Sequence, residues 1–191
     1  MTEPKATTPA AAGAAVEASS RRPDPSSRDV IRRARSINRA ALEAVHALLQ
    51  ASIPSLECPG VPAWPARLGV ALAEECLSLE LIYRCLDQQG AALEHPAFPG
   101  LAESVQALER TVLTLREVGR KKLMLASLAV SAAGGSEISL GAEEDLRPLR
   151  ALSDAVRREA LGLARKLGQQ QDLLDRAIET RAALVQQVFL G

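Results

Sequence analysis

The sequence predicts an all-α protein, an antiparallel bundle of about four helices with a long C-terminal helix and a disordered N-terminal tail. Apolar residues make up 47% of the 191 positions, whereas aromatic residues make up only 2%. Alanine and leucine therefore supply most of the apolar residues, and both are strong helix formers. Apolar residues also recur at three- to four-residue spacing in four stretches, which proline- or glycine-rich segments separate.

The predicted tail covers residues 1–26, and the predicted helical bundle domain covers residues 27–191. The tail is rich in Ala, Pro, Thr and Ser and offers little apolar surface for a core, so we expect it to be disordered. It differs from a secretory signal, because Glu3 stands near its start and only Ala and Gly occupy the place of a leucine-rich core.

The first two helices are predicted by apolar stripes on either side of a proline-rich break. Ser26 or Ser27 is placed to cap the first helix, whose stripe consists of Val30, Ile37, Ala41, Val45 and Leu48. Prolines at positions 54, 59, 62 and 65 follow, and Pro65 suits the first turn of the second helix, which needs no amide donor. The second stripe consists of Leu68, Leu72, Leu79, Ile82, Leu86 and Leu93.

The last two helices are predicted on either side of the segment "AAGGSEISLGAEED". The third carries the heptad series Leu101, Val105, Leu108, Val112 and Leu115. The fourth opens with the acidic turn Glu143–Asp145, and its segment from Pro148 to Phe189 would be roughly 60 Å long, whereas the first helix reaches only about 37 Å. One partner cannot cover so long a helix, so we expect part of its apolar stripe to pack against a bent neighbour, a second subunit or a client.

Charge limits the classes of partner. The 23 basic and 23 acidic residues cancel, so the chain lacks the positive charge expected of a nucleic-acid binder. No apolar run approaches the roughly 18 residues of a membrane span. Residues 28–51 carry five arginines against two acids, and residues 52–99 carry two arginines against six acids. The first two helices could therefore lie side by side, or these charges could simply face solvent.

The cysteines do not form a recognisable metal or redox site. Cys76 and Cys85 are nine residues apart, half a turn out of phase, so on one helix they face opposite sides. Cys58 stands alone in the proline-rich segment, and His46 and His95 have no metal-ligand spacing. We expect the cysteines to behave as small apolar residues and the protein to reside in a reducing cytoplasm.

No catalytic constellation is present either. Glu74 and Glu75 diverge by about 100° on a helix and cannot act as an acid–base pair, and neither a nucleophile elbow nor a phosphate-binding glycine loop occurs. We therefore expect no enzyme activity, no cofactor and no metal. Trp64 is expected to plug the end of the bundle, and the basic cluster Arg120–Lys122 is expected to face solvent.

Three stretches resemble the FlgN family of flagellar export chaperones over about residues 65–189. These are "LAEECLSLELIYRCLDQQGAALEH", "LAESVQALERTVLTLREVGRKKLMLASLA" and "LGQQQDLLDRAIETRAALVQQ". The matching residues are Leu86, Gln89, Ala92, Leu93, Arg120, Leu123, Ser127, Leu128, Gln170, Leu173 and Leu174. The tail, the proline-rich segment, the "PAFPG" turn and Gln170 in place of the usual Asn depart from the family pattern.

The resemblance implies a cytoplasmic chaperone of the flagellar type III export pathway. Such a protein would hold C-terminal helical segments of hook-associated proteins unassembled, with no cofactor. The expected partner contacts lie on the last helix, at Leu174, Ile178, Val185, Val188 and Phe189. Helical anchors of a client at i, i+3, i+4 and i+7 would fit such a stripe. The same residues suit a homodimer seam, so the alternative is a self-associating structural bundle without catalytic activity.

Overall fold

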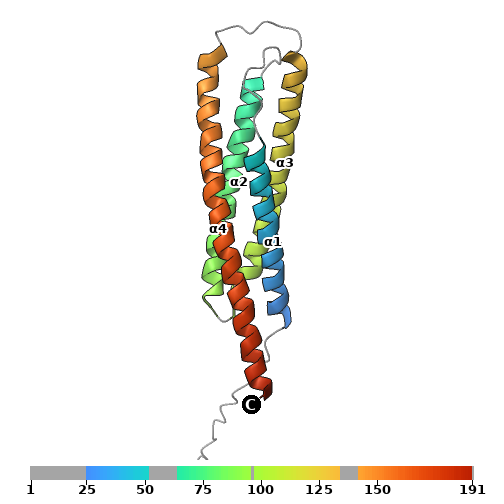
Figure 1. Ribbon diagram of the computed structural model, residues 1–191, viewed down its shortest axis with the longest axis vertical. Helices are drawn as coiled ribbons and strands as arrows, with labels where there is room; N and C mark the ends of the chain where they lie inside the picture. The colour runs from blue at the N-terminus through green and yellow to red at the C-terminus, as the bar shows by residue number, and fades with distance from the viewer. Residues whose placement is uncertain (1–24, 52–63, 96, 134–141, 191) are drawn as a thin grey trace, which may run out of the picture.

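The computed structural model describes residues 25–51, 64–95, 97–133 and 142–190. Within these ranges the chain forms four helices and no strand: α1 (Pro25–Gln50), α2 (Trp64–Leu93), α3 (Leu101–Ala133) and α4 (Ala142–Leu190). Each helix runs opposite in direction to the one before it, which gives an elongated up-and-down bundle (Figure 1). The predicted fold class is confirmed. The predicted tail, up to residue 24, lies outside the described residues, as does Cys58.

α1 begins slightly earlier than predicted, and α4 begins with the predicted acidic turn. α1 starts at Pro25, so Ser26 and Ser27 lie inside its first turn. Proline is favoured there because the amide it lacks would have no helical partner. α4 starts at Ala142 and contains Pro148. This proline removes one backbone hydrogen bond from the second turn without ending the helix. α2 also continues through Gly90 to Leu93.

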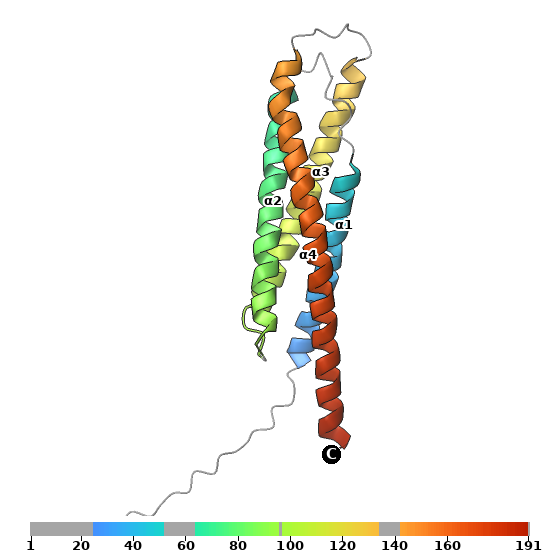
Figure 2. The ribbon, with the colours of Figure 1, turned by 60° about the vertical axis from the view of Figure 1, so that its left-hand side comes forward.

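The helices are not arranged in the order in which the chain makes them. α1 packs against α3 and α4, and α2 also packs against α3 and α4, so that α1 lies diagonally opposite α2 (Figure 2). The expectation of a basic first helix beside an acidic second helix is therefore wrong. Two arginines of α1 instead form ion pairs with carboxylates on α3 and α4, the helices that pack against it. Arg33 pairs with Glu109 of α3 at 2.7 Å and Arg35 with Asp175 of α4 at 2.9 Å.

The first half of α4 runs beside and parallel to α2. The hydroxyl of Tyr83 on α2 donates a hydrogen bond to the carbonyl of Glu159 at 3.5 Å. Gly162 makes room for this ring, because a Cβ atom there would lie 2.6 Å from the tyrosine oxygen. One turn further on, Lys166 forms an ion pair with Asp87. These contacts fix the register of the parallel pair.

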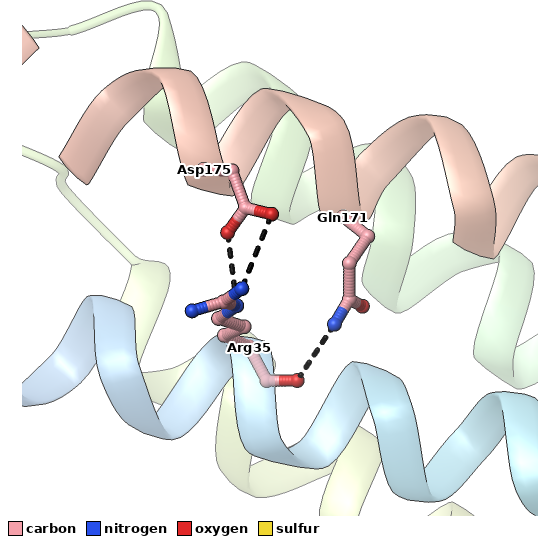
Figure 3. Close-up of polar contacts among 3 residues, drawn as sticks. All are labelled: Arg35, Gln171 and Asp175. Carbon is pink, nitrogen blue, oxygen red and sulfur yellow. Dashed lines mark hydrogen bonds and ion pairs between the residues drawn. The ribbon is translucent and has the colours of Figure 1, made fainter. Parts of the chain in front are cut away.

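The second half of α4 runs antiparallel to α1. Gln171 donates a hydrogen bond from Nε2 to the carbonyl of Arg35 at 3.5 Å, and the Arg35 guanidinium meets the Asp175 carboxylate one turn beyond (Figure 3). The partner of α4 thus changes from α2 to α1 along its length. As predicted, no single helix covers α4, but two helices of the same chain cover most of it in succession.

The core consists of two apolar clusters. The larger extends along most of the bundle, and the smaller lies where α2 turns into α3 and contains Ile31, Ala34, Ala92, Leu101, Val105 and Leu174. Between them are three fully or almost fully buried amides: Asn38, Gln89 and Gln170. Asn38 Nδ2 donates to Gln89 Oε1 at 3.1 Å. Gln170 lies beside Gly90, where an added Cβ would be 3.9 Å from its Oε1.

The amides are incompletely satisfied by the described residues. Asn38 Oδ1, Gln89 Nε2 and Gln170 Nε2 have no hydrogen-bond partner there. Buried polar groups of this kind reduce stability but disfavour every helix register that would place them against leucine. We infer that this layer fixes the axial alignment of α1, α2 and α4.

The turn between α2 and α3 closes the smaller cluster. Gly100 has a φ of 76°, a value that glycine adopts without strain, and Phe98 has a φ of 50°. The Phe98 ring is held from two sides. It packs against the smaller cluster, and the Arg181 guanidinium of α4 lies 4.1 Å from its centroid. This cation–π contact ties the turn to α4.

Asn38→Ala tests the role of the amide layer. The substitution leaves Gln89 Oε1 buried without its donor, so we expect a loss of about 1–3 kcal/mol in the free energy of unfolding, measured by urea denaturation. Ser36→Ala, on the exposed side of α1, is the control and should stay within about 0.5 kcal/mol of wild type. Equal stability of Asn38→Ala and the control would show that the layer has no such role.

Candidate helix-binding surfaces

The C-terminal turns of α4 extend past the other helices. α4 is 49 residues long, about 73 Å, whereas α1 and α2 have 26 and 30 residues, or about 39 and 45 Å. Beyond the level where α1 begins, no other described helix lies beside α4, and its last turns stand alone in both views (Figures 1 and 2). We refer to residues 183–190 as the α4 overhang.

The predicted partner contacts divide into three groups. Leu174 is fully buried in the smaller apolar cluster, so the prediction of a partner contact there is corrected: its side chain packs inside the subunit. Ile178 is half-buried at the edge of the same cluster. Val185, Val188 and Phe189 lie on the overhang backbone, but their side chains are outside the described part of the structure, and their predicted contacts stay predictions.

A small apolar pocket lies at the base of the overhang. It has a volume of about 150 Å³ and is lined by Ile31, Ile178 and Ala182 together with Arg28, Arg32 and Arg181. An apolar cavity of this size accommodates a ring the size of benzene. It is therefore large enough to receive one apolar side chain from a partner.

The arginines give this pocket a positive rim. Arg28 and Arg32 form no ion pair with any described residue. Burial, and then the positive charge of Arg28, lower the pKa of Arg181. A carboxylate beside this pocket would relieve the repulsion between these guanidinium groups. The rim therefore favours a partner that carries an acidic residue next to its apolar anchor.

A buried ion pair joins α2 and α3. The Lys122 ammonium lies 2.7 Å from one oxygen of Glu75 and donates a hydrogen bond to the other at 2.9 Å. Glu75 is fully buried and Lys122 is 5% exposed. The expectation that Arg120–Lys122 faces solvent is thus wrong for Lys122, which points into the bundle, while Arg120 and Lys121 are exposed. Burial raises the pKa of Glu75, and Lys122 opposes this shift.

A second hollow adjoins this ion pair where α1 ends. It has a volume of about 410 Å³ and lies between α1, α2 and α3. Its apolar lining includes Leu48, Leu115 and Leu123, of which Leu123 is 53% exposed, and Glu75 and Lys122 contribute to its wall. The hollow is positioned at the level where α3 continues beyond the last turn of α1.

The two described cysteines lie as the helix spacing predicts, whereas the side chain of Trp64 is outside the described part of the structure. Cys76 is half-buried and Cys85 is buried on the opposite side of α2, and burial raises the pKa of both thiols. His46 is exposed on α1. Among the described residues, no group of three or more His, Cys, Asp or Glu side chains is placed to hold a metal ion. In the same part of the chain, no helix is both long enough and apolar enough to cross a membrane.

Three comparisons with known proteins found no relative. No protein-family model, no curated protein and no solved structure matches this chain. The structure itself defines the class of protein as an elongated four-helix bundle with an extended C-terminal helix.

Removing one partner of the buried ion pair should destabilise the protein strongly. Lys122→Met leaves the Glu75 carboxylate buried without a counter-ion, so we expect a loss of about 3–5 kcal/mol in the free energy of unfolding. The double variant Glu75→Leu/Lys122→Met should recover most of this loss, because both charges are then replaced by apolar groups. Urea denaturation measures the free energy of unfolding of both variants. A Lys122→Met variant as stable as wild type would contradict the role of the buried ion pair.

The pH dependence of stability should report on Glu75. Its pKa is raised in the folded state, so the folded protein binds this proton more tightly than the unfolded chain does. Relative to Glu75→Gln, wild type should lose stability as pH rises from about 4.5 through the raised pKa, and then level off. Glu80→Gln, at an exposed acid on the same helix, is the control and should run parallel to wild type.

Proposed function

We propose that the protein is a cytoplasmic export chaperone of the flagellar type III pathway. In this proposal it binds a C-terminal helical segment of a hook-associated protein and keeps that segment unassembled. The observation that carries the proposal is the end of α4, where a helix leaves the bundle beside an apolar pocket with an arginine rim. The resemblance of three sequence stretches to the FlgN family supplies the identity of the pathway and client.

The proposed client is an amphipathic helix that lies along the overhang. One of its apolar side chains enters the pocket between Ile31 and Ile178, and a neighbouring carboxylate meets Arg28 or Arg32. Further apolar anchors follow the overhang at the register positions of Val185, Val188 and Phe189. These positions continue the spacing of Leu174 and Ile178 along the helix.

Self-association is the competing function, since the overhang of a second copy presents the same spacing. The export chaperone and the self-associating bundle differ in what covers the overhang. A chaperone leaves it open at working concentration and binds a client there, whereas a structural bundle forms a dimer or higher oligomer through it. A dimer would also bury the pocket of each subunit.

The test measures binding of isolated C-terminal segments of flagellar hook-associated proteins by isothermal titration calorimetry. Wild type should bind with a Kd of tens of micromolar or tighter, about −6 kcal/mol or more favourable. Val185→Asp/Val188→Asp should weaken binding roughly tenfold or more, because each places a charge on the apolar side of the overhang. Leu161→Ser, at a residue of α4 that is 46% exposed and far from the overhang, is the matched control and should bind normally.

Two outcomes would contradict this proposal. One is the absence of binding by every such segment to folded wild type. The other is a concentration-dependent oligomer, seen by sedimentation velocity, that the Val185→Asp/Val188→Asp variant abolishes. The second result would establish self-association as the function of the overhang.

A further inference from the structure

The amide layer of Asn38, Gln89 and Gln170 contains three buried polar atoms that no described residue satisfies. They are the acceptor Asn38 Oδ1 and the donors Gln89 Nε2 and Gln170 Nε2. Asn38 and Gln89 are fully buried, and Gln170 is 5% exposed. A buried amide group without a hydrogen bond lowers the stability of the fold, and buried polar groups in proteins nearly always have a partner.

The three amides lie close together in the centre of the bundle. Asn38 Nδ2 donates to Gln89 Oε1 at 3.1 Å, and this hydrogen bond crosses the core because α1 and α2 are diagonal in the bundle. Gln170 approaches from α4. Its Oε1 would lie 3.9 Å from a Cβ atom on Gly90, the residue that follows Gln89. One small group could therefore contact all three amides.

Small residues leave room for such a group at this level. The core positions of α1 on either side of Asn38 are the fully buried Ala34 and Ala41, and α2 has Gly90 next to Gln89. Ala41 belongs to the larger apolar cluster and Ala34 to the smaller, so the amide layer lies where one cluster ends and the other begins. Alanine fills less of the centre than the leucines elsewhere in the core. A water molecule needs about 30 Å³ and two to four polar partners.

The hydrogen-bonding capacity of the three amides selects the group that fits. One hydrogen bond between Asn38 and Gln89 leaves one donor and one acceptor unused, whichever way the two amides are turned. Gln170 adds a further donor. A chloride ion would accept from the two donors but would be repelled by the Asn38 oxygen. Water both donates and accepts hydrogen bonds, so one molecule satisfies both kinds of group.

We propose that the amide layer binds one water molecule in the centre of the bundle. The water accepts hydrogen bonds from Gln89 Nε2 and Gln170 Nε2 and donates one to Asn38 Oδ1. It then makes about three hydrogen bonds, as buried water in proteins typically does. This site lies in the core and is separate from the α4 overhang, so the inference does not depend on the proposed function.

The water site coincides with the change of partner along α4. Lys166 forms an ion pair with Asp87 of α2, and Gln171 donates a hydrogen bond to the carbonyl of Arg35 on α1. Gln170 lies between these two contacts in the sequence of α4. The water therefore joins α4 to both of the helices that cover it. Gln171 itself lies outside the site, because it diverges from Gln170 by about 100° around the helix.

The experiment compares wild type with the triple variant Asn38→Leu/Gln89→Leu/Gln170→Leu by ¹⁷O magnetic relaxation dispersion, which counts long-lived internal water molecules. Wild type should hold one more such water than the variant, in which every amide of the layer is replaced by an apolar side chain. Ser104→Ala is the matched control. Ser104 is also buried, but its hydroxyl donates to the Leu101 carbonyl, so this variant should hold as many long-lived waters as wild type.

A second measurement on wild type tests the site even where the triple variant fails to fold. In nuclear Overhauser spectra, the side-chain amide protons of Gln89 and Gln170 should show cross-peaks to water with the sign of a long-lived contact. Those of Gln88, which is exposed on α2, should not.

Three outcomes would overturn the inference. The first is an equal number of long-lived waters in wild type and the triple variant. The second is the absence of the water cross-peaks at Gln89 and Gln170. The third is stabilisation of wild type, but not of the triple variant, by added chloride, because that result would assign the site to an anion.

Discussion

The arrangement of the bundle depends on how the apolar side of α4 is covered. At 49 residues this helix is longer than either neighbour, so no single partner can bury its stripe. The chain covers it with two helices in succession, α2 along the first half and α1 along the second. This requires α1 and α2 to lie on either side of α4, hence diagonally opposite one another. α1 and α2 follow one another in the chain but are diagonal in the bundle, whereas α2 and α3 are adjacent.

Polar groups inside the bundle keep these helices in one register. A core of alanine and leucine tolerates sliding by a heptad, because one leucine replaces another at little cost. The amide layer at Asn38, Gln89 and Gln170 and the ion pair of Glu75 with Lys122 do not tolerate it. Any slip would leave a charge or an amide facing apolar side chains. Arg35 and Asp175 supplement this control at the surface of the α1–α4 pair.

The sequence predicts the helices well and their neighbours poorly. Apolar spacing identifies all four helices, because each buries one side, and it places Cys76 and Cys85 on opposite faces of α2. Neighbour choice depends on pairs such as Arg35–Asp175, 140 residues apart, which local spacing does not reveal. The basic composition of α1 suggests an acidic neighbour but does not say which one.

The burial of Glu75, Lys122 and Asn38 was not predicted, but the heptad series contains a signal for it. Glu75 stands between Leu68 and Ile82 in steps of seven, Lys122 follows Leu115 by seven, and Asn38 stands midway between Ile31 and Val45. A polar residue in such a series is a candidate for a buried pair. The burial of Leu174 was harder to predict, because it depends on where α1 begins relative to α4.

Residue-resolved amide hydrogen exchange along α4 measures how far α2 and α1 cover this helix. In dilute protein without a partner, we expect strong protection from Leu149 to about Ile178, where α2 and then α1 cover the helix, and steeply falling protection beyond Ala183. Protection that continues undiminished to Leu190 at every concentration would contradict an uncovered overhang. Loss of protection already before Leu174 would contradict the cover by α1 on which the arrangement of the bundle rests.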